Sequence, residues 1–303
     1  MGEYSKSAII KYTRKALGMT QEELSESICD PVSLARYESG KTNPTDEKFL
    51  RLMEKMGEKG SIFFLPLETD QIEIEKNIEE LKKAVECYKW EEAEQIYIGL
   101  KSNKKFNLEY PENKQYLKWA ETLIKNRTGK LDLRQSILEL EKAWAYTCGH
   151  FSTKEFPLNR IYRETEIRIL HDLAVFYKIS GQYKEACDYY ERLLKYFERK
   201  DMINDCKPVY FIYLGYSNVL GLMGEHEKSR ELCFKAIKRG LMQDQTNYLY
   251  NFYYNIGYSL QKYGNEEEKK MAKLYIWIAY QLCLNYPENN RNLQIIKNTY
   301  EQC

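Results

Sequence analysis

Apolar residues recur at every third or fourth position along most of this chain. Such a spacing places them on one face of an α-helix. Clear examples are Ile78, Leu81 and Val85, and further on Ile137 and Leu140. Runs in which polar and apolar residues alternate are few and short, and only seven of the 303 residues are proline. The pattern predicts an all-α protein with almost no sheet.

A helical unit repeats from about residue 75 onward. The run Tyr177–Ala186 places Gly181 between two helical segments, and similar text follows at Leu222–Ser229 and Gln261–Gly264. Each copy has a small residue early in its second segment, at spacings of 43, 50, 43 and 43: Ala93, Ser136, Ala186, Ser229 and Ala272. Small residues let the two helices of a hairpin pack closely, as in tetratricopeptide repeats, whose period is about 34 residues. We therefore expect residues 75–303 to form about five hairpins and a C-terminal helix, stacked as a right-handed TPR-like superhelix with a concave inner face.

Residues 1–60 have the pattern of a helix-turn-helix domain of the λ-repressor type. Thr20 and Glu23 match a capping box, which predicts a short helix that runs to about Ile28. Asp30 is a second N-cap candidate, and the helix that it starts ends at Gly40. Two short helices joined by a tight turn are the arrangement that places one helix in the major groove of DNA. Residues 61–74 are expected to form a linker to the repeats.

The second helix of this motif supplies the residues expected to contact DNA bases. Its exposed candidates are Val32, Ser33 and Arg36. Arg36 can form a bidentate bond with guanine, and Val32 can pack on a thymine methyl group. We expect contacts with phosphates from a second group: Gln21, Lys41, Arg14 and Lys15.

Simpler roles compete with these assignments. Arg36 can instead form an internal ion pair with Glu38 or Glu22, and Lys15 and Lys41 can be ordinary solvated side chains. Residues 1–60 hold ten basic and ten acidic side chains. This neutrality counts against DNA binding, because contacts with phosphates need local positive charge.

The combination of both domains resembles the RNPP family of peptide-responsive transcription regulators, closest to its PlcR and Rgg type. The resemblance is carried by Leu17–Gly40, and also by Tyr116–Trp119 and Ile137–Lys142. It implies a cytoplasmic homodimer that binds a palindromic operator in double-stranded DNA. It also implies that a short signalling peptide binds in the concave groove and changes DNA binding, which would make the protein a quorum-sensing receptor.

The residues expected to bind a peptide lie on the first helix of the last three repeats. An extended peptide needs partners for its backbone, and amide side chains suit this because they both donate and accept hydrogen bonds. The candidates in the third and fourth repeats are Arg168, His171, Lys178 and Asn218. Those in the fifth repeat share one helical face: Asn251, Tyr254, Asn255, Tyr258 and Gln261. Arg168 and Lys178 are a candidate pair for a peptide carboxylate.

Each of these peptide assignments also has a simpler alternative. The chain contains 27 tyrosines, so that a tyrosine stripe is often packing between repeats. Arg168 and Lys178 can equally belong to a solvated face. Where family members often have asparagine on the inner face, this chain has His171 or Val175, and Gly215.

Composition and motifs narrow the remaining classes of function. Lys and Arg (46) balance Asp and Glu (45), and the eight cysteines have the wide spacing of free thiols in a reducing cytosol. The N-terminus lacks the pattern of a signal peptide, and no apolar run reaches the ~18 residues of a membrane span. Nucleotide-binding and hydrolase motifs are missing, and the three histidines are isolated. We therefore expect no catalytic residues, no metal, no cofactor and no membrane contact.

Two other functions stay open. The repeats of a transcription regulator can bind a partner protein instead of a peptide. Alternatively, the chain is a scaffold that does not bind DNA, in which the N-terminal helices dock onto a protein.

Overall fold

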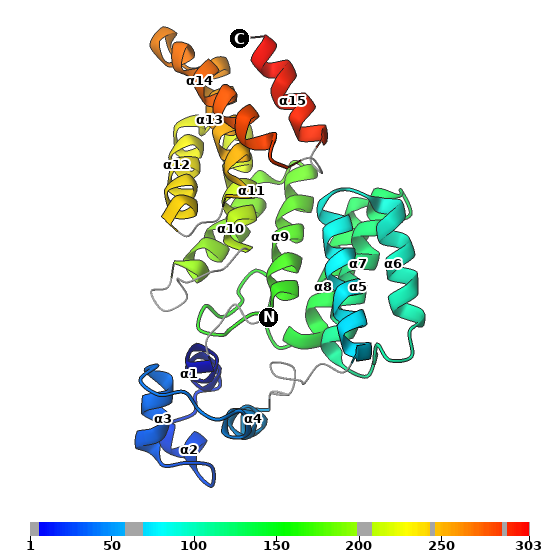
Figure 1. Ribbon diagram of the computed structural model, residues 1–303, viewed down its shortest axis with the longest axis vertical. Helices are drawn as coiled ribbons and strands as arrows, with labels where there is room; N and C mark the ends of the chain where they lie inside the picture. Colours follow the sequence, from blue (N-terminus) through cyan, green and yellow to red (C-terminus); the bar gives the residue numbers. More distant parts are fainter. Residues whose placement is uncertain (1–5, 58–68, 199–207, 243–245, 287–289, 303) are drawn as a thin grey trace.

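The fold is built entirely of helices in the part of the chain that the structure describes. The computed structural model describes residues 6–57, 69–198, 208–242, 246–286 and 290–302. The first four helices, α1 to α4, form an N-terminal domain: Lys6–Ala16, Gln21–Ser25, Pro31–Glu38 and Asp46–Lys55. Eleven more helices, α5 to α15, form the second part of the molecule (Figure 1): Thr69–Glu86, Trp90–Ser102, Pro111–Arg127, Leu133–Cys148, Glu164–Ile179, Tyr183–Phe197, Pro208–Leu222, His226–Met242, Leu249–Tyr263, Glu266–Cys283 and Asn290–Glu301.

The N-terminal domain packs around one small apolar core. Leu24 and Leu34 from the two short helices are fully buried there, together with Ile10 and Phe49. The predicted capping box forms, since the Thr20 hydroxyl accepts from the Glu23 amide at 3.1 Å and the Thr20 amide donates to the Glu23 carboxylate at 2.7 Å. The predicted helix starts in this domain are therefore confirmed.

The helix α2 ends earlier than the sequence pattern indicated. We expected it to run to about Ile28, but its last residue is Ser25. Ser27 adopts a left-handed conformation with φ of 65°, which no α-helix can continue through. Ile28 nevertheless packs against the domain core from its place in the turn.

The second part is an array of five helical hairpins followed by a last helix. The hairpins pair α5 with α6, α7 with α8, α9 with α10, α11 with α12 and α13 with α14. All five small anchor residues are buried where the paired helices approach: Ala93, Ser136, Ala186, Ser229 and Ala272. The first helices of neighbouring hairpins also contact one another, so that α7, α9, α11 and α13 form an inner row. One large apolar core runs from Leu81 to Ala272. The predicted all-α fold with a TPR-like array is confirmed.

Left-handed residues close the turns of four hairpins. Gly129, Gly181 and Gly224 adopt φ of 73°, 78° and 85°. Glycine reaches this conformation without steric cost. In the first hairpin Tyr88 takes the corresponding place, with φ of 60°. The repeat pattern therefore predicted the turns at Gly181 and Gly224, but it pointed to neither Gly129 nor Tyr88.

The single spacing of 50 residues among the anchors has a structural cause. A segment of residues 149–163 joins α8 to α9, and we call it the α8–α9 connection. Arg192 of α10 donates from Nε and Nη2 to the carbonyl oxygen of Phe156 at 2.9 and 2.6 Å. The ring of Tyr162 stacks on Trp144 with centroids 5.7 Å apart. These contacts hold the connection on the array.

The α8–α9 connection also contacts the N-terminal domain. Tyr12 of α1 is 4% exposed and belongs to the apolar core of the array. Ile161 of the connection packs against both apolar cores. Figure 1 shows α1 beneath this segment. The two parts of the molecule therefore share an apolar contact in addition to their covalent link.

The expected linker of residues 61–74 is only partly described. Helix α5 begins at Thr69, within the range expected to be linker. Residues 58–68 lie outside the described residues. The expected boundaries, a domain of residues 1–60 and an array of residues 75–303, stay a proposal.

No helix in the described part of the chain combines the length and the apolar character needed to cross a bilayer.

We predict that Gly257→Ala destabilises the array. A Cβ atom at this position of α13 would lie 2.6 Å from Cγ1 of Ile276 and 3.0 Å from the carbonyl oxygen of Ala272, both on α14. Because the carbonyl cannot move away without disturbing its helix, we expect the free energy of unfolding to fall by about 1–3 kcal/mol. Urea denaturation followed by circular dichroism measures this loss.

Gly99→Ala is the matched control. Gly99 also lies within a helix, α6, but a Cβ atom there meets nothing within 4 Å. Alanine is the better helix former, so this variant should be unchanged or more stable by up to about 1 kcal/mol. Equal stability of the two variants would contradict the close approach of α13 and α14.

Candidate functional site

Helix α3 presents its N-terminal face to solvent. Asp30 caps this helix, and its carboxylate accepts from the Ser33 amide at 2.8 Å and from the Ser33 hydroxyl at 2.6 Å. The side chain of Val32 is 66% exposed, and Arg36 follows it one turn later on the same face. Val32 and Arg36 are thus free to meet a partner, whereas the Ser33 hydroxyl is engaged by the cap.

A buried ion pair holds α1, α2 and α3 together. Arg14 donates from Nε and Nη2 to the Glu38 carboxylate at 2.6 and 2.9 Å, and from Nη1 to the Met19 carbonyl oxygen at 2.6 Å. The Gln21 amide donates to the same carboxylate at 2.8 Å. Burial alone would raise the pKa of Glu38, but the hydrogen bonds from Arg14 and Gln21 lower it below its ordinary value. We expected Arg14 to contact phosphate; the structure instead buries it as a brace, and Gln21 is partly engaged in the same way.

Three ion pairs neutralise some of the basic side chains of this domain and leave others unpaired. Lys6 pairs with Asp46, Arg14 with Glu38, and Lys55 with Glu26. By contrast, three of the predicted DNA contacts form no ion pair with any described residue, and all are exposed: Lys15, Arg36 and Lys41. The alternative of an ion pair between Arg36 and Glu38 is wrong, because Arg14 occupies that carboxylate. The unpaired positive charge of the domain therefore includes the residues expected at DNA.

Arg168 on α9 is satisfied within the array. It pairs with Glu86 of α5 and, at 2.8 Å from Nε, with Glu164. Its guanidinium also lies over the ring of Phe211 at 5.2 Å. Arg168 and Lys178 are ten residues apart, which is about 15 Å along a helix. We had expected the two side chains to share one peptide carboxylate, but this separation is too large. Arg168 instead braces α5 against α9.

His171 and Asp172 form a half-buried polar centre in the next turn of α9. Asp172 accepts from the indole nitrogen of Trp119 at 2.7 Å, and burial raises the pKa of Asp172 to about 6. Burial, with Lys178 and Arg168 nearby, lowers the pKa of His171 to about 3. The Nδ1 atom of His171 is buried and finds no hydrogen-bond partner among the described residues. His171 is thus a neutral ring next to α11, where its centroid lies 4.7 Å from that of Phe211.

The structure brings Asn218 and Asn255 together between α11 and α13. Nδ2 of Asn255 donates to Oδ1 of Asn218 at 2.8 Å and approaches the Ser217 hydroxyl at 3.3 Å. No hydrogen bond to another described residue engages Nδ2 of Asn218 or Oδ1 of Asn255. The pair therefore keeps one donor and one acceptor, which are the two groups that a peptide backbone needs.

The other candidates on α13 are less uniform. The Tyr254 hydroxyl lies 3.2 Å from that of Thr299 on α15, and Asn251 is half-buried. Tyr258 is 41% exposed, its ring 6.0 Å from that of Tyr254. Gln261 is half-buried at the end of the stripe. The last helix α15 thus packs against the face that we assigned to a peptide.

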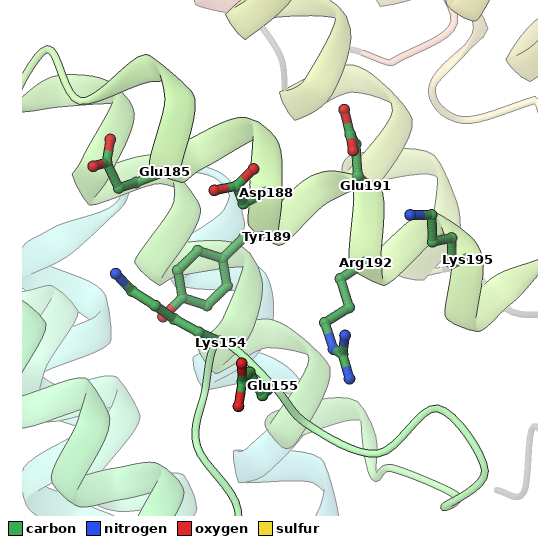
Figure 2. Close-up of a pocket in the computed structure, with 8 residues that line it drawn as sticks. All are labelled: Lys154, Glu155, Glu185, Asp188, Tyr189, Glu191, Arg192 and Lys195. Atoms are coloured by element: carbon green, nitrogen blue, oxygen red, sulfur yellow. The ribbon is translucent and has the colours of Figure 1, made fainter.

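A pocket of ≈ 360 Å³ lies elsewhere, between α10 and the α8–α9 connection. Figure 2 shows its charged lining, which includes Glu185, Asp188 and Lys195. None of the residues predicted to bind a peptide lines it. Within the described residues, no three side chains of His, Cys, Asp or Glu gather as a metal site.

Several residues on or against the inner row of helices were not predicted from the sequence. Trp119 and Asp172 meet across 53 residues, and Arg168 and Glu86 across 82. Tyr190 reaches in from α10, and its hydroxyl occupies the space where a Cβ atom of Gly215 would lie, 2.3 Å away. Only Gly215 gave a signal, since a glycine inside a helical pattern often marks a close approach.

Comparison with known proteins agrees with this architecture. Residues 10–63 match the family model of the helix-turn-helix domain. Over 96% of this chain and 98% of the other, the fold resembles PlcR of Bacillus thuringiensis in complex with the peptide PapR7 and DNA, with 21% identity and a TM-score of 0.65. The chain has the PlcR fold. The likeness predicted to RNPP regulators is thereby confirmed in the fold, and the chain carries a helix-turn-helix DNA-binding domain.

Two further structures extend the comparison. The apo form of Bacillus thuringiensis PlcR is 19% identical, covers 95% of this chain and 98% of its own, and gives a TM-score of 0.57. The apo form of ComR from S. thermophilus is 13% identical, with 98% and 99% covered and a TM-score of 0.50. Comparison with curated protein sequences gives no significant match.

We predict that Asp172→Asn stabilises the protein at alkaline pH. Burial raises the pKa of Asp172 from 3.8 to about 6, so that between these values the folded protein holds a proton that the unfolded chain has lost. Stability contributed by this group is therefore present below about pH 4 and is lost as the pH rises through 6. Asparagine keeps an oxygen acceptor for Trp119 but is never charged. We expect a gain of up to about 3 kcal/mol at pH 8 and a smaller one at pH 5.

Asp188→Asn is the control for this measurement. Asp188 is exposed on α10, where substitutions change stability by about 0.5 kcal/mol or less. Thermal unfolding at both pH values compares the two variants. A gain for Asp172→Asn that does not depend on pH would contradict a buried charge as its cause.

Proposed function

We propose that this protein is a peptide-responsive transcription regulator. It acts in the cytoplasm as a homodimer on a palindromic operator, and a short signalling peptide bound by the array changes its affinity for DNA. The observation that carries the proposal is the free face of α3, on which exposed Val32 and unpaired Arg36 stand one turn apart. The likeness over nearly the full length to PlcR in its complex with PapR7 and DNA supports the link to a peptide.

Each part of the proposal assigns a role to particular residues. Val32 and Arg36 contact base edges in the major groove, and Lys15 and Lys41 contact phosphates. At Gln21 the backbone amide at the start of α2, and not the side chain, contacts a phosphate. Ser33 holds the start of α3 in place through its hydrogen bonds with Asp30. Two-fold symmetry brings two such domains to the half-sites of one palindrome. Because one neutral domain attracts DNA weakly, the second domain is needed for tight binding.

The inner row of helices is the proposed place for the peptide. Asn218 and Asn255 bind its backbone through the donor and the acceptor that they leave unused. His171, Tyr258 and Gln261 line the path of the peptide on α9 and α13, while Arg168, Asn251 and Tyr254 support it from within the array.

We predict that Arg36→Ala weakens sequence discrimination. Duplexes are first selected from a random pool by the wild-type protein, and fluorescence anisotropy then compares the selected duplex with a scrambled one. Loss of a bidentate contact with guanine should reduce the preference by about 1–3 kcal/mol. Lys41→Ala is the contrasting variant, since loss of a phosphate contact weakens both duplexes alike and reduces the salt slope by about 1. A preference unchanged in Arg36→Ala would refute the assignment of α3.

A second prediction concerns the coupling between peptide and DNA. Calorimetric titration with small peptides secreted by the cells that make this protein should find one that binds the full chain. The same peptide should shift affinity for the selected duplex by about 5–150-fold, the usual range of allosteric coupling. Asn255→Leu should weaken peptide binding and leave DNA binding without peptide unchanged. Tight DNA binding that no secreted peptide alters would favour a partner protein as the ligand of the array.

A further inference from the structure

Helix α14 is apolar on nearly all of its sides. In the run Met271–Leu284 only Lys273 and Gln281 have strongly polar side chains. One face of this helix packs on α13. Leu274 and Trp277 lie on the side away from α13, and each is nearly half exposed. A helix that is apolar all round is normally covered all round, so the outward face of α14 is unusual for a surface helix.

Helix α12 lies beside α14 and extends this outward face. Arg230 of α12 pairs with Glu268 of α14 at 3.4 Å. Further along, the rings of Phe234 and Tyr275 meet edge to face with centroids 5.9 Å apart. Both contacts advance in the same direction along the chain, so that α12 and α14 run side by side. Leu241 follows Phe234 by seven residues and shares its face of α12.

The two helices together present one apolar surface, which we call the α12–α14 surface. Half of a large side chain amounts to about 100 Å², so its six members present roughly 600 Å². Monomeric proteins rarely expose a contiguous apolar surface of this size. The outward side of α10 is charged instead (Figure 2). The α12–α14 surface has six side chains, each 44–57% exposed: Phe234, Leu241, Met271, Leu274, Trp277 and Leu284.

No described segment of the chain covers the α12–α14 surface. Helix α15 packs on the other side of the last hairpin, where the hydroxyls of Thr299 and Tyr254 lie 3.2 Å apart and Nζ of Lys273 lies over the ring of Tyr300. The N-terminal domain contacts the array at the α8–α9 connection. The cover of this surface therefore comes from another molecule.

The size and the position of the α12–α14 surface fit a second copy of the chain. A stable interface buries about 800 Å² per partner, with an apolar core and a charged rim such as Glu231, Lys238 and Lys270 supply here. In Figure 1 the N-terminal domain lies on the same side of α9 as α12 and α14, and the first two hairpins lie on the other. A two-fold axis along that side, parallel to the long direction of the molecule, brings both N-terminal domains to one end of the dimer.

We propose that the α12–α14 surface joins two copies of this chain. The inference rests on the homodimer of the proposed function, and it names the surface through which that dimer forms. In a two-fold contact the same surface is used by both copies, so Leu274 and Leu241 are each buried twice. The dimer is then held by the last two hairpins of the array, and DNA is not needed to assemble it.

The test is the oligomeric state of the full-length protein, measured by sedimentation velocity alone and with the duplex that the wild type selects. Leu274→Glu on α14 and Leu241→Glu on α12 should each raise the dissociation constant of the dimer by about 100-fold. About tenfold comes from each of the two copies that lose an apolar side chain. Circular dichroism and thermal unfolding establish that the variants are folded. Because two helices are tested, failure of one variant to fold does not remove the test.

Leu138→Glu is the matched control. Leu138 is a leucine of similar exposure on α8, the second helix of another hairpin, and it lies outside the α12–α14 surface. This variant should dimerise as the wild type does. Equal weakening in the control would overturn the inference, because an added charge alone would then explain the loss.

The outcomes separate this inference from the function on which it rests. If the wild type is monomeric both alone and with the duplex, the homodimer and this inference fall together, and the surface is left to a different protein. If the wild type is a dimer that both variants retain, only this inference falls. A dimer that is weakened in either folded variant and unchanged in the control establishes the α12–α14 surface as the interface.

Discussion

The array depends on the close approach of the two helices of each hairpin, which is possible only where one of them carries a small side chain. In each hairpin the second helix can approach the first only because Ala93, Ser136, Ala186, Ser229 or Ala272 leaves room for it. A single hairpin cannot bury its apolar face, so the paired helices stack and share one core. The stacking then places the first helices side by side, and every candidate group for the peptide, from Arg168 to Gln261, lies on this inner row.

The N-terminal domain has no net charge in residues 1–60, yet it exposes three cationic side chains that form no ion pair with a described residue: Lys15, Arg36 and Lys41. Some of its acidic side chains are engaged in internal pairs. The clearest case is Glu38, whose carboxylate accepts hydrogen bonds from both Arg14 and Gln21. Truncating Glu38 would leave the buried guanidinium of Arg14 without a counter-ion, which costs far more than an exposed pair is worth. The same pair that braces the three helices therefore also keeps Arg36 free of the carboxylate two residues away.

Local signals in the sequence predicted local structure well. The caps at Thr20 and Asp30 and the buried anchors follow from neighbouring residues alone, and the structure confirms them. Contacts between distant segments could not be predicted in this way. The early end of α2 depends on Ser27, a residue type that rarely adopts positive φ, and the role of Arg168 depends on Glu86, 82 residues away. Exposure of Val32 follows from the helical period, but the burial of Arg14 follows from its partner on another helix.

The contact of Tyr12 and Ile161 makes the α8–α9 connection a second attachment point for the N-terminal domain. A domain held by a covalent linker alone samples many orientations, and each half-site of a palindrome selects a few of them at an entropic cost. Here the buried ring of Tyr12 restricts that freedom before DNA is met. In the proposed homodimer, the distance and angle between the two N-terminal domains would then depend on the array as much as on the linker, and the range of half-site spacings would be correspondingly narrow.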